Sequence, residues 1–113
     1  MKVDGLVLLA DGECRRLADL GVDGMAVDLF YRGMVGVAAD YERCPIARAI
    51  AAVLGLEEGT VLASRFGVSY KSGLFPGVVE HGLCAFKGGL LPIREFVEAF
   101  DGGEFPFLHG EDK

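Results

Sequence analysis

Glycine is the feature that most restricts how this chain can fold, because it occurs 17 times in 113 residues, about twice its average share. The glycines follow no repeat period, and a glycine weakens any helix or strand that contains it, so they indicate turns between short elements. A chain of this length is expected to form a single domain. We predict one domain over residues 1–108 and a polar tail over residues 109–113.

Two prolines predict the starts of two helices. Pro45 and Pro92 suit a first helical turn, where the N–H that proline lacks would have no partner. Apolar residues recur at helical spacing from Pro45 to Gly55, which predicts a helix over residues 45–54 that ends at a left-handed glycine. The same spacing after Pro92 predicts a helix over residues 92–100. Its apolar positions are Ile93, Phe96, Val97 and Phe100.

The first forty residues predict strands and one further helix. Residues 2–9 form a mostly apolar run that is typical of a strand, and Asp11 then has the right chemistry to cap a helix over residues 12–20. Residues 25–31 alternate in part between apolar and polar side chains. Together with residues 34–37 they predict one or two more strands.

The middle of the chain predicts a β-hairpin. Residues 60–70 and 78–87 are rich in β-branched and aromatic side chains, and a loop over residues 71–77 joins them. We therefore expect an α+β fold with a small antiparallel sheet, formed by the hairpin at about 60–87 and the N-terminal strands. The helices expected to pack on this sheet cover about residues 12–20, 45–54 and 92–100.

The end of the chain carries a candidate protein-interaction surface. The segment 104–108 is too apolar to extend freely into solvent, so we expect it to pack back on the domain, with His109 solvated beyond it. Apolar side chains left exposed here or in the hairpin loop would form an interface, flanked by the acids of the last helix. The candidate interface residues are Leu74, Phe75, Glu95, Glu98, Asp101, Glu104, Phe105 and Phe107.

Three widely spaced cysteines argue against a disulfide framework and favour a reducing compartment. Cys44, at the start of a predicted helix, is either a reactive thiol with a lowered pKa or a small buried apolar residue. We favour the second interpretation because no nucleophile–base signature accompanies it. His81 and Cys84, with Cys14 or Cys44, offer a zinc site, but structural zinc sites bring paired ligands at both ends of the spacing. We therefore predict no metal and no cofactor.

The distribution of charge along the chain limits the kinds of partner that the protein can bind. The net charge is −6, and the acidic residues are concentrated in residues 1–31 and 92–113. Nucleic-acid affinity comes largely from Lys and Arg that neutralise phosphates, so we predict no direct binding to nucleic acid. The apolar run near the start is interrupted by an acid and is far shorter than a bilayer span. We predict a cytoplasmic protein with no membrane segment, and the oligomeric state stays open.

The motifs together are similar to a pattern found in small uncharacterised proteins of phages and prophages. That pattern combines a Cys-Pro-x-Ala helix start at residues 44–47, a short β unit, a Leu-Pro helix that begins at residues 91–92 and ends in Phe-Asp, and a Pro-Phe tail at 106–107. The resemblance covers about residues 40–108. It implies an accessory protein that binds a host or defence protein in the host cytoplasm, in the manner of an anti-CRISPR protein.

Three functions follow from these observations. The first is a non-enzymatic protein that binds and modulates or inhibits a host or defence protein, which the missing catalytic constellation favours. The second is a small thiol- or metal-dependent enzyme that uses Cys44 and His81. The third is a structural or self-assembling protein, in which hairpin edges or the apolar tail pair copies of the chain.

Overall fold

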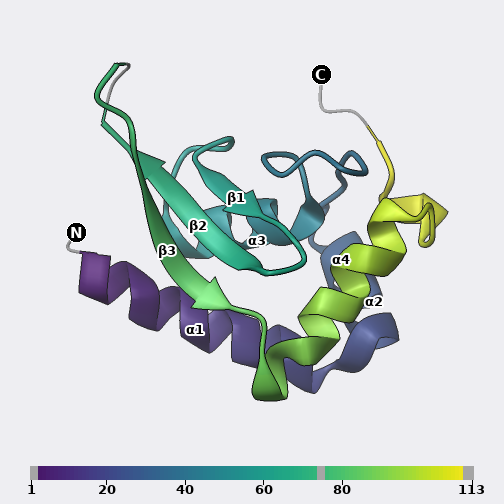
Figure 1. Ribbon diagram of the computed structural model, residues 1–113. Coiled ribbons are helices and arrows are strands. Elements are labelled where there is room, and N and C mark those ends of the chain that lie inside the picture. Colours follow the sequence, from purple (N-terminus) through teal and green to yellow (C-terminus); the bar gives the residue numbers. More distant parts are fainter. Residues whose placement is uncertain (1–2, 74–75, 111–113) are drawn as a thin grey trace.

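The computed structural model describes residues 3–73 and 76–110 and confirms the predicted α+β class (Figure 1). None of the helices in these ranges has both the length and the apolar composition needed to cross a bilayer. The elements in chain order are α1 (Val3–Asp19), α2 (Gly21–Tyr31), α3 (Pro45–Leu54), β1 (Val61–Ala63), β2 (Gly67–Ser72), β3 (Val79–Ala85), η1 (Gly88–Leu90), α4 (Leu91–Asp101) and η2 (Pro106–Leu108).

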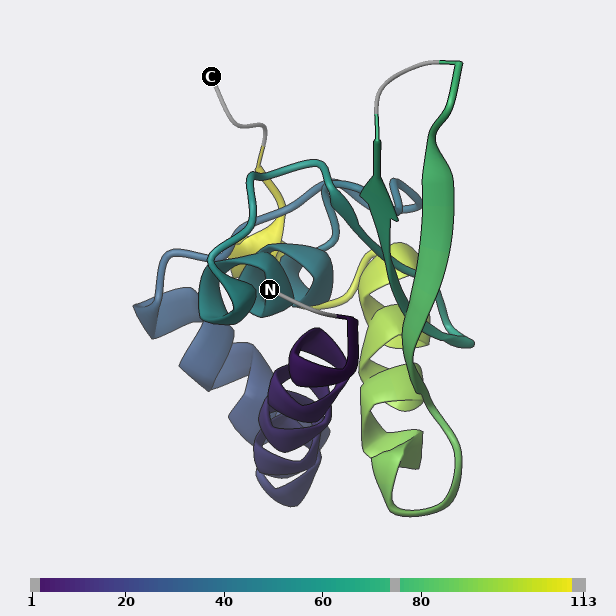
Figure 2. The ribbon, with the colours of Figure 1, turned by 90° about the vertical axis from the view of Figure 1, so that its left-hand side faces the viewer.

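The sheet is antiparallel, with strand order β1-β2-β3. Helix α1 runs along β3, helix α3 packs on β1, and α2 packs on α4 (Figures 1 and 2). The end of β2 and the start of β3 project beyond the helices in both views. The core therefore lies between the sheet and the helices, and it also fills the space between α1, α2 and α4.

Helix α1 replaces the strand that we predicted for residues 2–9, which is wrong for the described residues 3–9. Leu6, Ala10, Cys14 and Leu17 recur at helical spacing and are all buried, so one continuous apolar stripe decides the structure. The predicted helix over 12–20 is the second half of α1. Asp11 does not cap it, because it lies inside the helix and accepts a 2.8 Å hydrogen bond from Arg15.

Helix α2 likewise replaces the strand predicted for residues 25–31. Met25, Ala26 and Leu29 are buried on one helical face, a spacing that a half-buried strand does not give. No strand forms over residues 34–37 either; Gly36 makes only an isolated parallel bridge to His109. The N-terminal strands of the predicted sheet are therefore absent from the described residues, and β1 supplies its third strand.

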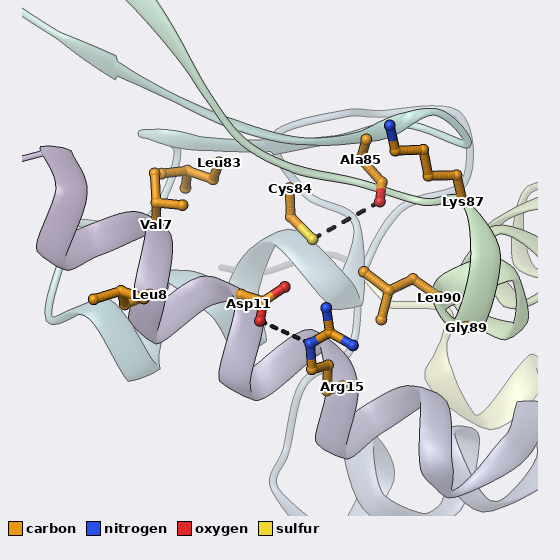
Figure 3. A pocket seen from close by; sticks show the side chains of 10 residues that line it. All are labelled: Val7, Leu8, Asp11, Arg15, Leu83, Cys84, Ala85, Lys87, Gly89 and Leu90. Atoms are coloured by element: carbon orange, nitrogen blue, oxygen red, sulfur yellow. Dashed lines mark hydrogen bonds and ion pairs between the residues drawn. The ribbon is translucent and has the colours of Figure 1, made fainter.

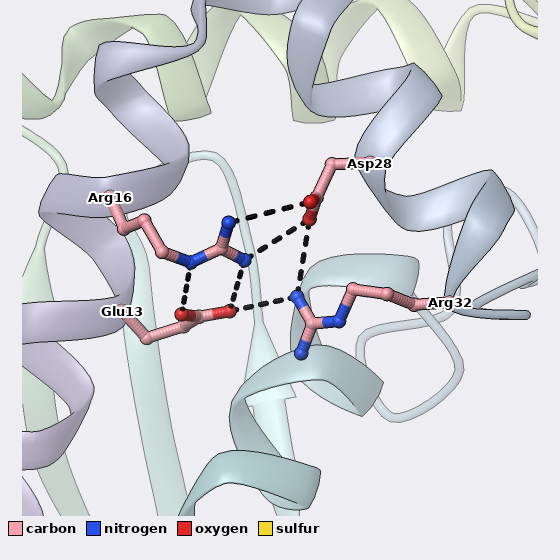
Figure 4. A network of polar contacts seen from close by, with 4 residues as sticks. All are labelled: Glu13, Arg16, Asp28 and Arg32. Carbon is pink, nitrogen blue, oxygen red and sulfur yellow. Dashed lines mark hydrogen bonds and ion pairs between the residues drawn. The ribbon is translucent and has the colours of Figure 1, made fainter.

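An ion-pair network fixes α2 against α1 (Figure 4). Glu13, only 8% exposed, accepts hydrogen bonds from Arg16 at 2.8 and 3.0 Å and from Arg32 at 2.8 Å. Asp28 accepts from both arginines at 3.1 to 3.3 Å. Each carboxylate is thus shared by two guanidinium groups, a planar geometry that suits charge-assisted hydrogen bonding.

The network also sets two pKa values. Burial raises the pKa of Glu13, but the hydrogen bonds and charges of Arg16 and Arg32 outweigh it and hold the pKa below its ordinary value of 4.5. For Asp28, the hydrogen bond from Arg16 is the largest cause of a pKa below the ordinary 3.8, and Arg32 adds to it. Both carboxylates are therefore stabilised in the charged form by folding.

Both proline-started helices are confirmed. Cys44 adopts an extended conformation immediately before Pro45, and α3 ends at Gly55 with φ of 69°, as the sequence predicts. Leu56 folds back on the last turn, where its N–H donates to Ala51 at 3.0 Å. Helix α4 begins at Leu91, one residue before Pro92.

The hairpin is confirmed in its second half and corrected in its first. Residues 60–70 form two strands rather than one, since β1 turns over residues 64–66 into β2. Between β2 and β3 the register shifts: Val68 pairs with Cys84 and Ser69 with Gly82, so Leu83 is an extra residue. This β-bulge directs the side chains of two consecutive residues, Leu83 and Cys84, toward the same face of the sheet.

The first two residues of the predicted polar tail, His109 and Gly110, are packed against the domain. The N–H of Gly36 donates to Leu108 at 2.8 Å, and the N–H of Gly110 donates back to Gly36 at 3.0 Å. His109 is half-buried and stacks on Phe100 with ring centres 4.1 Å apart, so the expectation of a solvated histidine is wrong. The packed chain extends through Gly110.

Gly36 lies between the end of the chain and the segment that precedes α3, where there is no room for a side chain. A Cβ atom at this position would collide with the carbonyl oxygen of Arg43 and with the ring of Pro45. We expect Gly36→Ala to lower the free energy of unfolding by about 2 kcal/mol, because the backbone must shift to accept a methyl group. Urea denaturation followed by circular dichroism measures the change.

Gly12 provides the matched control, since it lies on the exposed side of α1 with open space around it. Gly12→Ala should raise the free energy of unfolding by about 0.5 to 1 kcal/mol through helix propensity alone. Equal effects of the two glycine-to-alanine changes would contradict the packing of Gly36 described here.

A pH dependence follows from the network of Glu13 and Asp28. Because folding lowers both pKa values, the network contributes stability above the unfolded values and loses it as the pH falls through the folded ones. We expect the urea midpoint to decrease between about pH 5 and pH 3, and less steeply in Glu13→Gln. Glu57→Gln, at an exposed position, should retain the wild-type slope. Parallel curves for Glu13→Gln and wild type would refute the assignment.

Candidate functional site

Three aromatic side chains meet on the surface where α2 ends against η2. Phe30 contacts Tyr31 with ring centres 5.7 Å apart and Phe107 with ring centres 5.4 Å apart, both edge to face. The exposed fractions are 47% for Phe30, 81% for Tyr31 and 46% for Phe107. We refer to these three residues as the aromatic patch. Large apolar side chains that are exposed and contiguous are typical of protein interfaces.

Phe105 anchors the C-terminal side of the aromatic patch. Its ring stacks on Phe96 at 5.3 Å and makes an edge contact with Phe107 at 6.2 Å. Its backbone has φ of 57°, a left-handed conformation that is uncommon for a bulky residue. The next residue, Pro106, begins η2, and the N–H of Leu108 donates to the Phe105 carbonyl at 2.9 Å. Core stacking thus holds a strained turn that presents Phe107 to solvent.

The structure brings together only part of the candidate interface predicted from the sequence. Phe107 lies in the aromatic patch, and Phe105 is half-buried beneath it. Leu74 and Phe75 lie outside the described residues. The prediction missed Phe30 because residues 25–31 were interpreted as a strand. With the helical stripe of α2 recognised, the two aromatics at its end fall outside the buried face and are expected to be exposed.

Two of the four predicted acids, Glu98 and Asp101, border a hollow apart from the aromatic patch. Glu98 pairs with Arg65 and Arg94, each at 3.8 Å, and Asp101 accepts a 2.9 Å hydrogen bond from the N–H of Ala39. The hollow beside them measures about 470 Å³. It is lined by Tyr41, Ser64, Arg65, Phe66, Glu98, Asp101 and Gly102. Glu95 and Glu104 are exposed. Two of the four acids thus serve contacts within the fold.

Cys44 is a core residue with a poorly ionising thiol. It is 2% exposed, and its burial raises its pKa to about 12 even though the N–H groups of Ile46 and Ala47 act in the opposite direction. These observations support the interpretation of Cys44 as a buried apolar residue. They oppose its use as the nucleophile of an enzyme, since the thiolate is the reactive form.

His81 is engaged within the sheet. It stacks on Tyr70 with ring centres 4.8 Å apart, and its Nε2 lies 2.8 Å from the hydroxyl oxygen of Ser72. Over residues 3–73 and 76–110, no three His, Cys, Asp or Glu side chains converge as a metal-binding group. The histidine therefore has a structural role in pairing β2 with β3.

Comparison with known protein families, with curated proteins and with solved structures finds no match to this chain.

The burial of Cys44 leads to a labelling prediction. In the native protein at pH 8, iodoacetamide should leave Cys44 unmodified, since its thiol is both protonated and out of reach. In 6 M guanidinium the same residue should react fully, with mass spectrometry of the digested protein reporting the modification. Rapid native labelling of Cys44 would show that the start of α3 is open, contrary to this structure.

Proposed function

We propose that this protein is a non-enzymatic binding protein that docks another protein on the aromatic patch. The observation that carries the proposal is the contact of Phe30 with both Tyr31 and Phe107, since all three rings are about half or more exposed. Folding of this chain leaves the three rings partly exposed to solvent. A partner that covers them gains the hydrophobic free energy that folding leaves unused.

The rings are suited to serve as binding hot spots. Tyr and Phe supply large contact areas with only two side-chain torsions each, so little conformational entropy is lost on binding. Edge-to-face contacts already restrict Phe30 and Phe107 before any partner arrives. Tyr31, at 81% exposure, is the residue we place at the centre of the interface, where its hydroxyl can donate to the partner.

Charge indicates the kind of partner. The chain carries a net charge of −6, and the exposed Glu104 lies three residues from Phe107. An apolar pocket with a basic rim is the complementary surface, because opposite potentials speed association and exclude like-charged proteins. A nucleic acid is disfavoured by the same charge.

The identity of the partner as a host or defence protein rests on the sequence resemblance to phage and prophage proteins alone. Under that proposal, the protein works as an inhibitor or modulator in the manner of an anti-CRISPR protein. The aromatic patch is the surface through which it would act.

In-cell photo-crosslinking tests the proposal with two tyrosines as a matched pair. Benzoylphenylalanine at position 31 should form an adduct with another protein, whereas the same substitution at Tyr41, which is 59% exposed in the segment between α2 and α3, should not. Phe107→Ala should weaken the isolated complex by roughly 30-fold or more, the effect of losing one hot spot. Tyr41→Ala should leave the dissociation constant unchanged.

Sedimentation velocity over a range of concentrations separates this function from self-assembly. A monomer with an adduct to a second protein supports the proposal. A position-31 adduct with twice the mass of the chain would show that the patch pairs two copies. Equal adducts at positions 31 and 41 would show that neither tyrosine marks the interface.

A further inference from the structure

A hollow of about 360 Å³ lies between α1 and β3, and it exposes a cysteine (Figure 3). Cys84 points into this space from β3, with its sulfur 3.9 Å from the carbonyl oxygen of Ala85. Asp11 and Arg15 approach from α1 and are joined by a 2.8 Å ion pair, while Lys87 lines the hollow from the chain that follows β3. The thiol is therefore accessible to a small polar molecule.

The β-bulge explains why Cys84 faces α1. Leu83 is the extra residue opposite Val68 and Ser69, so Leu83 and Cys84 can both turn toward the helix instead of alternating. Leu83 is buried there, and Cys84 is half-buried against the same core. Without the bulge, one of the two neighbours would point to the opposite face of the sheet.

A second cysteine lies behind the first. Cys14 belongs to the buried stripe of α1, is fully buried, and neighbours Cys84 across the packing of α1 on β3. The nearness of the two thiols lowers the pKa of Cys84 by more than burial raises it, and together with burial it raises the pKa of Cys14. Cys84, which opens to the hollow, is therefore the thiol that a reagent meets first.

We propose that Cys84 and Cys14 form a peroxide-reactive dithiol site, in which the accessible Cys84 is oxidised by a hydroperoxide and the buried Cys14 resolves it to a disulfide. Neither the protein-binding function proposed above nor the aromatic patch is needed for this site. In a reducing compartment such a disulfide is transient, since cellular thiols return it to the dithiol.

The chemistry balances in two steps. In the first, the Cys84 thiolate attacks one oxygen of the hydroperoxide, the O–O bond breaks, and Cys84 becomes a sulfenic acid. The hydroxide or alkoxide that leaves takes up a proton. In the second step, Cys14 attacks the Cys84 sulfur, the S–O bond breaks, and the proton of Cys14 leaves with the oxygen as water. The two thiols lose two electrons, and the hydroperoxide gains them.

The surroundings support the first step. The Arg15 guanidinium lies in the same hollow as the Cys84 sulfur, so cationic N–H groups are near the oxygen that departs with negative charge. The second step joins neighbouring thiols from two elements that pack against each other, Cys14 of α1 and Cys84 of β3. The disulfide forms when their sulfurs approach to about 2.05 Å.

Mass spectrometry of the intact chain tests the site. After reduction, removal of the reductant and treatment with one equivalent of hydrogen peroxide, the wild-type protein should lose the mass of two hydrogen atoms. Digestion without reduction should then yield a Cys14–Cys84 linked peptide. We expect Cys84 to react several-fold faster than free cysteine at pH 7, because Arg15 beside it favours the thiolate and the charge that develops on the departing oxygen.

Three variants identify the roles. Cys14→Ala, which adds no polar atom to the core, should trap the sulfenic acid on Cys84, where dimedone labels it. Cys84→Ser should abolish the reaction, since Cys14 is inaccessible. Cys44→Ala is the matched control at another buried cysteine and should form the linkage at the wild-type rate. Circular dichroism verifies that each variant is folded.

Two results would overturn the proposal. One is wild-type Cys84 that accumulates as sulfenic or sulfinic acid with no linked peptide, which would show that Cys14 does not resolve it. The other is Cys84 that reacts no faster than free cysteine in the folded wild-type protein, which would show an ordinary surface thiol. If Cys14→Ala does not fold, the linked peptide and the wild-type rate still decide the question.

Discussion

Burial of the apolar stripe on α1 is the interaction on which the other elements depend. This helix contacts α2, α3, α4, η1 and β3, and Ala10, Cys14 and Leu17 on its inner face are completely buried. The stripe carries small side chains at Ala10 and Cys14 between larger ones at Leu6 and Leu17, so neighbouring elements approach α1 at different distances. A change in the course of α1 would displace the sheet and the other helices together.

The aromatic patch and the Cys14–Cys84 pair both depend on α1, but in different ways. The ion pairs of Glu13 and Arg16 with α2 set the position of that helix, whose last residues form the aromatic patch. Cys14, on the same helix, meets Cys84 because β3 packs directly along α1. One element thus supports a binding surface through charge and a thiol pair through packing. The two proposals rest on separate residues and fail or succeed independently.

The sequence predicted part of the candidate site and misjudged the rest for identifiable reasons. Phe107 is a candidate interface residue from the sequence, within a chain end expected to pack back on the domain, and in the structure it is 46% exposed. Phe30 and Tyr31 were missed because a short apolar run fits a strand or a helix equally well until its burial is known. The thiol pair was missed because an odd number of cysteines argues against a disulfide framework, although it does not exclude a single pair.

The sequence by itself determined the local features that need only one or two residues. Proline at positions 45 and 92 fixes a backbone angle and removes an N–H, so both helices begin where the sequence predicts, and Gly55 ends the first of them. Only the tertiary structure decided that residues 3–9 and 25–31 are helical, since each short apolar run taken alone fits a strand or a helix until partners cover one face of α1 and α2. It also decided which distant residues meet, because the packing of α1 on β3 and of α2 on the chain end is set by the whole core.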